Sequence, residues 1–99
     1  FVTPRQAESI ICRRRECVKT FDFTNLRLNY IEDEYFIFAE SDSSESASAI
    51  RKKYFAAQEI LGGEKLVLVF DRLNGKTKRA IEDSEISYFI AGETLKIFS

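Results

Sequence analysis

Hydrophobic residues recur with helical spacing in two parts of the chain. Between residues 4 and 19 they fall three and four positions apart, which is typical of one face of a helix. Thr3 and Gln6 form a capping-box pattern at the start of this segment. The same spacing predicts a second helix that follows the serine-rich segment 41–45 and ends at about Leu61, where Gly62-Gly63 supplies a stop.

Other segments show the pattern of strands. Alternation of apolar and polar residues predicts strands over 24–30 and 35–39, joined as a hairpin across Glu32-Asp33-Glu34. The apolar run 66–70 predicts a central strand, and 94–98 predicts a final one.

The remaining segments connect these elements. Asn74-Gly75 predicts a tight turn, 76–87 is charged and weakly patterned, and a turn is expected at 91–93. A hairpin, a helix laid across it and further strands are the order of an α+β, β-grasp sheet crossed by one helix. We therefore divide the chain into a helical extension, residues 1–22, and a β-grasp domain, residues 23–99.

Length and composition set limits on the class of protein. Ninety-nine residues with 44% hydrophobic content suffice for one domain with its own core. The net charge of −1 argues against general attraction to nucleic acid, and the apolar runs are too short to span a membrane. Cys12 and Cys17 fall on different faces of the first predicted helix, so we expect reduced thiols in an intracellular protein.

Four short motifs resemble SUMO and the SUMO-like domains of the ubiquitin superfamily. Together they lie within residues 23–99 and occur in the order that this family shows. The motifs are Asn25-Leu26-Arg27-Leu28, Lys53-Tyr54-Phe55-Ala56-Ala57-Gln58, Leu66-Val67-Leu68-Val69-Phe70-Asp71 and Gly92-Glu93-Thr94-Leu95-Lys96-Ile97-Phe98.

The resemblance implies a module that binds another protein without covalent attachment. SUMO continues beyond its last strand to a Gly-Gly tail, whereas this sequence ends at Ser99. It is similar in this respect to genome-maintenance proteins that carry SUMO-like domains at their C-termini. That similarity implies a nuclear protein of DNA repair that docks on the SUMO-conjugating enzyme. Two departures are Glu93, which alone stands for an acidic cluster, and Val67, where a basic residue is common.

Strand alternation predicts which side chains face a partner. Leu66, Leu68 and Phe70 should face the crossing helix, as should Leu95 and Ile97. The opposite face should then present an apolar cluster with a polar rim, which is a common form of a small interface. The predicted partner-binding residues are Val67, Val69 and Phe98, with Arg27, Asn29, Lys96 and Glu93 around them.

Two other arrangements are open for this face. The N-terminal helix can cover it, burying Ile10, Ile11 and Val18, or that helix can pair with a second copy of the chain and form a homodimer. Arg51, Lys52 and Lys53 form a secondary basic rim. With Arg27, they also fit a Ras-association or band-4.1-type domain that binds an acidic partner.

The sequence offers little for catalysis. It contains no histidine, so the commonest general base and metal ligand is missing. Neither a phosphate-binding glycine loop nor a zinc-type cysteine pattern is present. Arg13-Arg14-Arg15 and Glu32-Asp33-Glu34 are interpreted as solvated charges. We expect a protein that is not an enzyme and that takes no cofactor, metal or small-molecule substrate.

Overall fold

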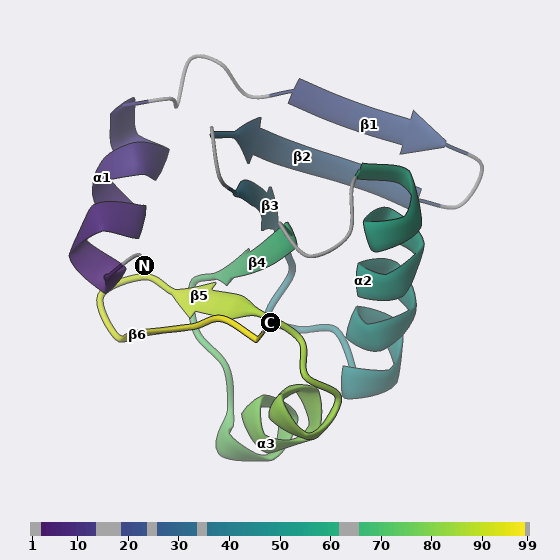
Figure 1. Ribbon diagram of the computed structural model, residues 1–99. Helices are drawn as coiled ribbons and strands as arrows, with labels where there is room; N and C mark the ends of the chain where they lie inside the picture. Colours follow the sequence, from purple (N-terminus) through teal and green to yellow (C-terminus); the bar gives the residue numbers. More distant parts are fainter. Residues whose placement is uncertain (1–2, 14–18, 24–25, 34–35, 62–65, 99) are drawn as a thin grey trace.

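A computed structural model describes residues 3–13, 19–23, 26–33, 36–61 and 66–98 (Figure 1). Cys17, Arg14, Arg15 and the Gly62-Gly63 stop lie outside the described residues. The elements are α1 (Pro4–Arg13), β1 (Lys19–Phe23), β2 (Leu26–Glu32), β3 (Ile37–Glu40), α2 (Ala47–Leu61), β4 (Leu66–Phe70), α3 (Gly75–Asp83), β5 (Tyr88–Ile90) and β6 (Thr94–Lys96).

The strands form one mixed sheet of six strands, in the order β1-β2-β3-β4-β5-β6. Strands β1, β2 and β3 form an antiparallel meander. Strands β3, β4 and β5 are parallel, and β6 returns antiparallel to β5. Helices α2 and α3 make the two connections between the parallel strands. The predicted α+β class, the mixed sheet and the hairpin between the second and third strands are therefore confirmed.

The expected neighbourhood of segments 66–70 and 94–98 is wrong. Strand β5 lies between β4 and β6, pairing Val69 with Phe89 on one side and Leu95 with Phe89 on the other. The β-grasp interpretation had required direct pairing of the two segments. It missed β5 because Tyr88–Ile90 is a strand of three residues without visible alternation.

Segment 76–87, predicted to be irregular, is mainly helix α3 and the approach to β5. Asn74-Gly75 is therefore not a hairpin turn: Asn74 is the N-cap residue of α3, and its Oδ1 accepts a hydrogen bond of 2.7 Å from the Thr77 N–H. Ile81 is the fully buried side chain of this helix, and the charged residues around it led the segment to be interpreted as irregular.

The N-terminal segment is also divided differently from the prediction. The capping box is confirmed, since the Gln6 N–H donates to Thr3 Oγ1 at 3.2 Å and the Thr3 N–H donates to Gln6 Oε1 at 2.9 Å. Helix α1 ends at Arg13 rather than near residue 19, and Lys19–Phe23 is strand β1. The strand had been hidden because Phe21 also suited the helical spacing.

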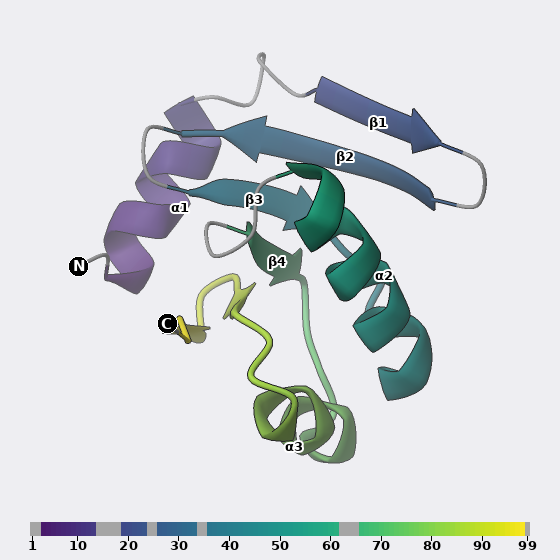
Figure 2. The same cartoon turned by 45° about the vertical axis from the view of Figure 1, so that its right-hand side comes forward.

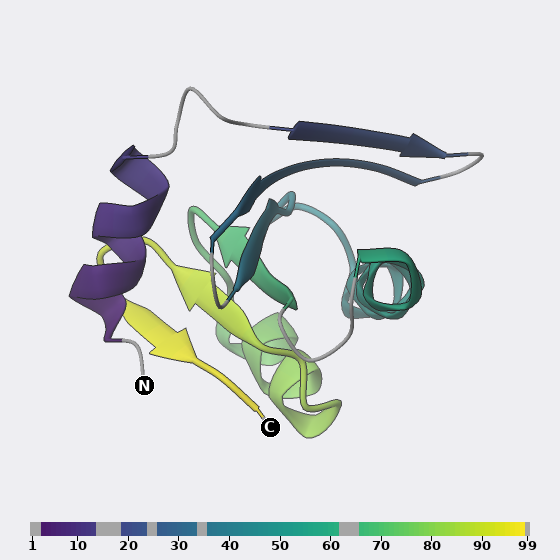
Figure 3. The ribbon, with the colours of Figure 1, turned by 45° about the horizontal axis from the view of Figure 1, so that its top comes forward.

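Helices cover both faces of the sheet, which gives three layers (Figure 3). Helices α2 and α3 lie on one face (Figure 2), above a core that contains Ile50, Tyr54 and Ile81. Helix α1 lies on the other face, where fully buried Ala7 belongs to a second cluster. The expected single crossing helix and open opposite face are therefore wrong. None of the helices within the described ranges has the length and apolar character needed to cross a membrane.

Candidate functional site: a groove beside helix α1

The site lies on the face of the sheet that α1 shares. Register aligns residues of neighbouring strands into a row: Thr20 with Asn29, Glu40 with Val69, then Phe89 and Leu95. The pairing of Tyr30 with Ala39 places Asn29 opposite Glu40, which completes the row. The row is polar at the β1 end and apolar at the β6 end. Helix α1 packs on the apolar part through the cluster that holds Phe89 and Leu95.

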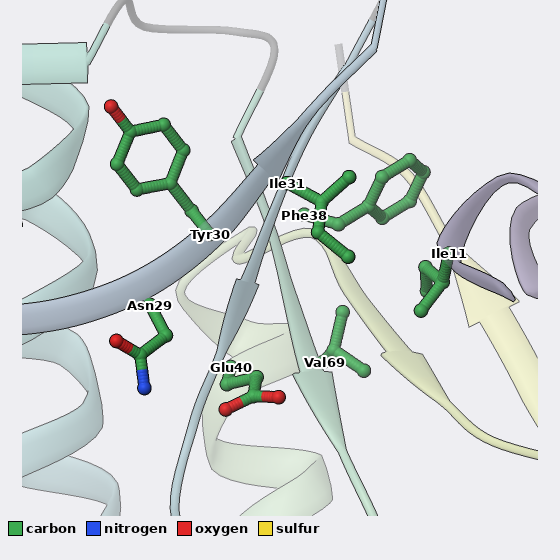
Figure 4. Close-up of a pocket in the computed structure, with 7 residues that line it drawn as sticks. All are labelled: Ile11, Asn29, Tyr30, Ile31, Phe38, Glu40 and Val69. Carbon is green, nitrogen blue, oxygen red and sulfur yellow. The ribbon is translucent and has the colours of Figure 1, made fainter. Parts of the chain in front are cut away.

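An apolar pocket lies between α1 and the neighbouring strands, at the edge of the area that α1 covers (Figure 4). Its volume is about 50 Å³. Ile11 of α1 and Val69 of β4 are partly exposed there, whereas Phe38 is buried below them. Figure 4 shows Asn29 and Glu40 together at one end of the pocket. The lining residues are Ile11, Asn29, Tyr30, Ile31, Phe38, Glu40 and Val69.

A second, polar cavity continues from the same end. It has a volume of about 330 Å³ and is open to solvent. Asn29 and Glu40 line both spaces, so the pocket and the cavity adjoin at these two residues, and the two together are called the groove below. The remaining lining residues of the cavity are Ser41, Asp42, Glu45 and Lys53. The cavity follows the carboxyl end of β3, the kind of position where sheets of parallel strands bind ligands.

The segment between β3 and α2 is fixed by its own hydrogen bonds. Asp42 Oδ1 accepts bonds from the Ser44 N–H at 2.8 Å and from its hydroxyl at 2.7 Å. These bonds, the backbone one first, lower the pKa of Asp42, so its carboxylate remains charged at neutral pH. The Ser46 hydroxyl accepts the Ala49 N–H at 3.1 Å and caps α2, as the serine-rich segment predicted.

The charges of the cavity do not balance locally. Lys53 forms an ion pair with Glu45 and lies partly buried against it. Glu40 is exposed and has no ion-pair partner among the residues that the structure describes. Glu40 and Asp42 therefore leave the groove acidic. The hydroxyl oxygen of Ser41 is buried in the cavity wall without a hydrogen-bond partner from the described part of the chain.

The structure separates the apolar residues that the sequence had placed in one open patch. Val67 is fully buried beneath α1, so its expected exposure is wrong, and the alternative of a covering N-terminal helix is confirmed for this part of the sheet. Val69 lies on the predicted face and stays partly exposed in the groove. Phe98 is half-buried, and its N–H donates to the Ser87 hydroxyl at 2.9 Å.

The side chains of the last strand face the opposite sides of the sheet from those predicted. Leu95 and Ile97 pack in the cluster beneath α1, while Lys96 pairs with Glu82 of α3 at 3.7 Å. The prediction failed because β6 takes its register from β5, with Tyr88 opposite Lys96, and not from β4. Lys96 and Phe98 therefore lie together on the α3 side, with the ammonium 6.0 Å from the ring centroid.

The other predicted site residues are scattered. Glu93 lies exposed in the β5–β6 turn, where Gly92 has a φ of 72° and the Glu93 N–H donates to Ile90 at 2.9 Å. Arg27 is placed on β2 opposite Asp22. Arg51 and Lys52 are exposed on α2, whereas Lys53 is paired in the groove, so the three do not form one rim.

Sequence reasoning missed two polar residues of the groove. Glu40 follows the predicted strand 35–39, and Asp42 lies in the segment interpreted only as the start of a helix. In the structure Glu40 ends β3, which pairs in parallel with β4, and ligands often bind beyond the carboxyl ends of parallel strands. The sequence did not reveal that pairing, so the position of these residues could not be recognised. Among the described residues, no three of the Cys, Asp and Glu side chains are grouped to hold a metal ion. Glu34 of the acidic run lies outside the described ranges.

Comparison with family models, with curated proteins and with solved structures found no match for this chain in any of the three.

Proposed function

We propose that the chain is a protein-interaction module that binds a segment of its partner, without covalent attachment, in the groove beside α1. The observation that carries this proposal is the apolar pocket formed by Ile11, Phe38 and Val69, which opens beside the exposed polar residues Asn29 and Glu40. An apolar recess with polar groups at its rim is the usual form of a small recognition site. The recess has room for a small aliphatic side chain.

The groove also suits binding more than chemistry. Its floor consists of strands, so the lining side chains are held in fixed positions relative to one another. Its ionisable groups are carboxylates and one lysine that is already paired. Binding is the role for which both parts of the groove supply contacts: apolar burial in the pocket and polar contacts in the cavity.

Asn29→Trp tests the proposal directly. Asn29 is exposed at the junction of the pocket and the cavity, so an indole there fills the mouth of the groove without entering either core. We expect partners captured from a cell extract by the wild-type chain to be lost with Asn29→Trp and kept with Glu59→Trp, which places the same ring on exposed α2. Purified partners are then titrated against each variant.

Equal affinity of a purified partner for wild type and Asn29→Trp, with both chains folded by circular dichroism, contradicts the proposal. Amide chemical shifts give a second check. Partner binding should move the resonances of Asn29, Glu40 and Val69 more than those of the α2 surface.

A narrower form of the proposal retains the resemblance to SUMO-like domains and names the SUMO-conjugating enzyme as the partner. Its support is the four motifs in order. The helix motif lies on α2 and the apolar motif contains all of β4, as they would in such a domain. Titration of the chain with the purified conjugating enzyme tests this form of the proposal. The absence of any change in amide chemical shifts at millimolar enzyme concentration contradicts it.

The second candidate function uses the exposed basic residues of α2. Arg51 and Lys52 are both exposed, which favours contact with an acidic partner of the kind that Ras-association domains bind. Charge reversal at both positions should then abolish binding, and affinity should fall steeply with salt. Asn29→Trp separates the two candidates because it leaves this surface unchanged.

A further inference from the structure

We infer that the occupant of the groove is an extended peptide segment in which a lysine or arginine lies two positions from an aliphatic side chain. The inference rests on the proposed function and specifies the chemistry of the partner. The aliphatic side chain enters the pocket formed by Ile11, Phe38 and Val69, and the cationic group meets the carboxylate of Glu40.

The charge of the groove identifies the second anchor. Three carboxylates, those of Glu40, Asp42 and Glu45, line the junction and the polar cavity, together with the ammonium group of Lys53. Lys53 pairs with Glu45, and Asp42 is held by hydrogen bonds from Ser44. Glu40 has no such partner among the described residues, so an arriving cation displaces no existing ion pair.

The geometry joins the two anchors. Glu40 is paired in register with Val69, so the carboxylate and the pocket wall arise on neighbouring strands about 4.8 Å apart. Side chains two positions apart on one side of an extended peptide are about 7 Å apart. A lysine or arginine two residues from the aliphatic anchor can therefore reach Glu40 while the anchor remains in the pocket. Figure 4 shows the Glu40 side chain beside Val69.

The groove also lacks an unpaired cation among its described lining residues, which favours a basic partner over an acidic one. Within the described part of the chain, Lys53 is the one cation that lines the groove. It is already paired and partly buried, so an acidic segment would meet unneutralised carboxylates. Repulsion from Glu40 and Asp42 then disfavours that segment, while a basic one is attracted. The same groove thus rejects acidic competitors and accepts basic ones.

A random heptapeptide library, displayed on phage, is selected on the 99-residue chain and on two variants. Glu40→Gln removes the charge at the junction and keeps the shape of the side chain. Glu59→Gln makes the same change on the exposed face of α2, away from the groove, and serves as the matched control. We expect wild type and Glu59→Gln to enrich Leu, Ile or Val with Lys or Arg two positions away.

Selection on Glu40→Gln should keep the aliphatic preference and lose the basic one. For a selected peptide synthesised with a fluorescent label, exchange of its basic residue for Gln should weaken binding to wild type about fivefold, as expected for a partly exposed ion pair. The same exchange should change binding to Glu40→Gln by less than twofold.

Enrichment of aliphatic residues without a basic neighbour overturns the inference and leaves the proposed function intact. Retention of the basic preference by Glu40→Gln also overturns the inference. Selected peptides whose binding is unaffected by Asn29→Trp show that the groove is not the binding site, and they overturn the inference together with the proposed function.

Discussion

The two faces of the sheet are built from the same strands but are covered to different extents. On the face of α2 and α3, the alternate residues Leu66, Leu68 and Phe70 of β4 are all fully buried. On the face of α1, Val67 is fully buried, but Val69 two residues later is partly exposed. One face of β4 thus belongs to a closed core, whereas the other face forms part of the wall of an open groove.

The cause of the difference is the number and position of the covering helices. The α2 and α3 helices are the connections between β3, β4 and β5, so the parallel pairing itself places them over the sheet. Helix α1 precedes the sheet and is ten residues long, and the cluster beneath it centres on Phe38, Val67 and Phe89. The polar row of Thr20, Asn29 and Glu40 continues beyond this cluster. The face of α2 and α3 is therefore closed by its core, and the groove lies on the face that α1 covers only in part.

Truncation in the closed core should give the largest effect. Leu68→Ala removes a fully buried side chain beneath α2 and should lower the free energy of unfolding by about 3 kcal/mol. Val69→Ala, one residue away in the groove, should cost only about 1 kcal/mol, because Val69 is already partly exposed. Urea denaturation followed by circular dichroism measures both, and equal costs would remove the contrast between the faces.

Introduction of a charge beneath α1 tests whether that helix closes its part of the sheet. Ala7 is fully buried against the sheet, so Ala7→Asp should cost about 2 kcal/mol through an unpaired polar group or through undocking of α1. Hydrogen exchange of the amides of α1 should increase more than that of α2. Glu8→Asp, on the exposed side of the same helix, is the control. An unchanged stability of Ala7→Asp would show that α1 does not pack as described.

Loss of the cap of α3 should have a smaller effect. Asn74→Ala removes the acceptor of the Thr77 N–H and should lower stability by about 1 kcal/mol, whereas Asn74→Asp should retain most of it. Equal losses of stability for Asn74→Ala and Asn74→Asp would contradict the capping role of the Asn74 side chain. Thermal denaturation at neutral pH distinguishes the two.

The smallest expected effect is a pH dependence of the stability that arises from Glu82 of α3. A hydrogen bond from the Tyr88 hydroxyl, aided by Lys96, holds the pKa of Glu82 below its usual value, despite some opposition from burial. Because the folded pKa lies below the unfolded one, this contribution is present above about pH 4.5 and is lost as the pH falls through the folded value.

Tyr88→Phe removes that hydrogen bond and should make stability fall less steeply with acid. Unfolding measured from pH 7 to pH 3 for both chains checks the expectation, with Asn74→Ala as a variant of comparable location that leaves Glu82 unchanged. An identical acid dependence of Tyr88→Phe and wild type would show that Tyr88 does not stabilise the carboxylate.

Much of the local structure followed from short-range patterns. The Thr3–Gln6 capping box, the helix ending at Leu61, the strand 66–70 and the turn before Thr94 occur where the sequence predicted them. Each depends on residues close in sequence, such as a cap, a periodic face or a glycine with positive φ. The assignment of Leu66 and Leu68 to one face and Val67 to the other was also correct, because side-chain alternation is a property of the strand itself.

What the sequence alone determined is therefore the set of strong elements and the faces of the central strand. The tertiary structure decided which strands are neighbours, and thereby placed β5 between β4 and β6, turned Lys96 toward α3 and set Glu40 beside Val69. These are contacts between segments far apart along the chain, and short-range patterns carry no information on such pairing. Burial of Val67 and exposure of the groove likewise depend on where α1 packs, which the periodicity of α1 left open.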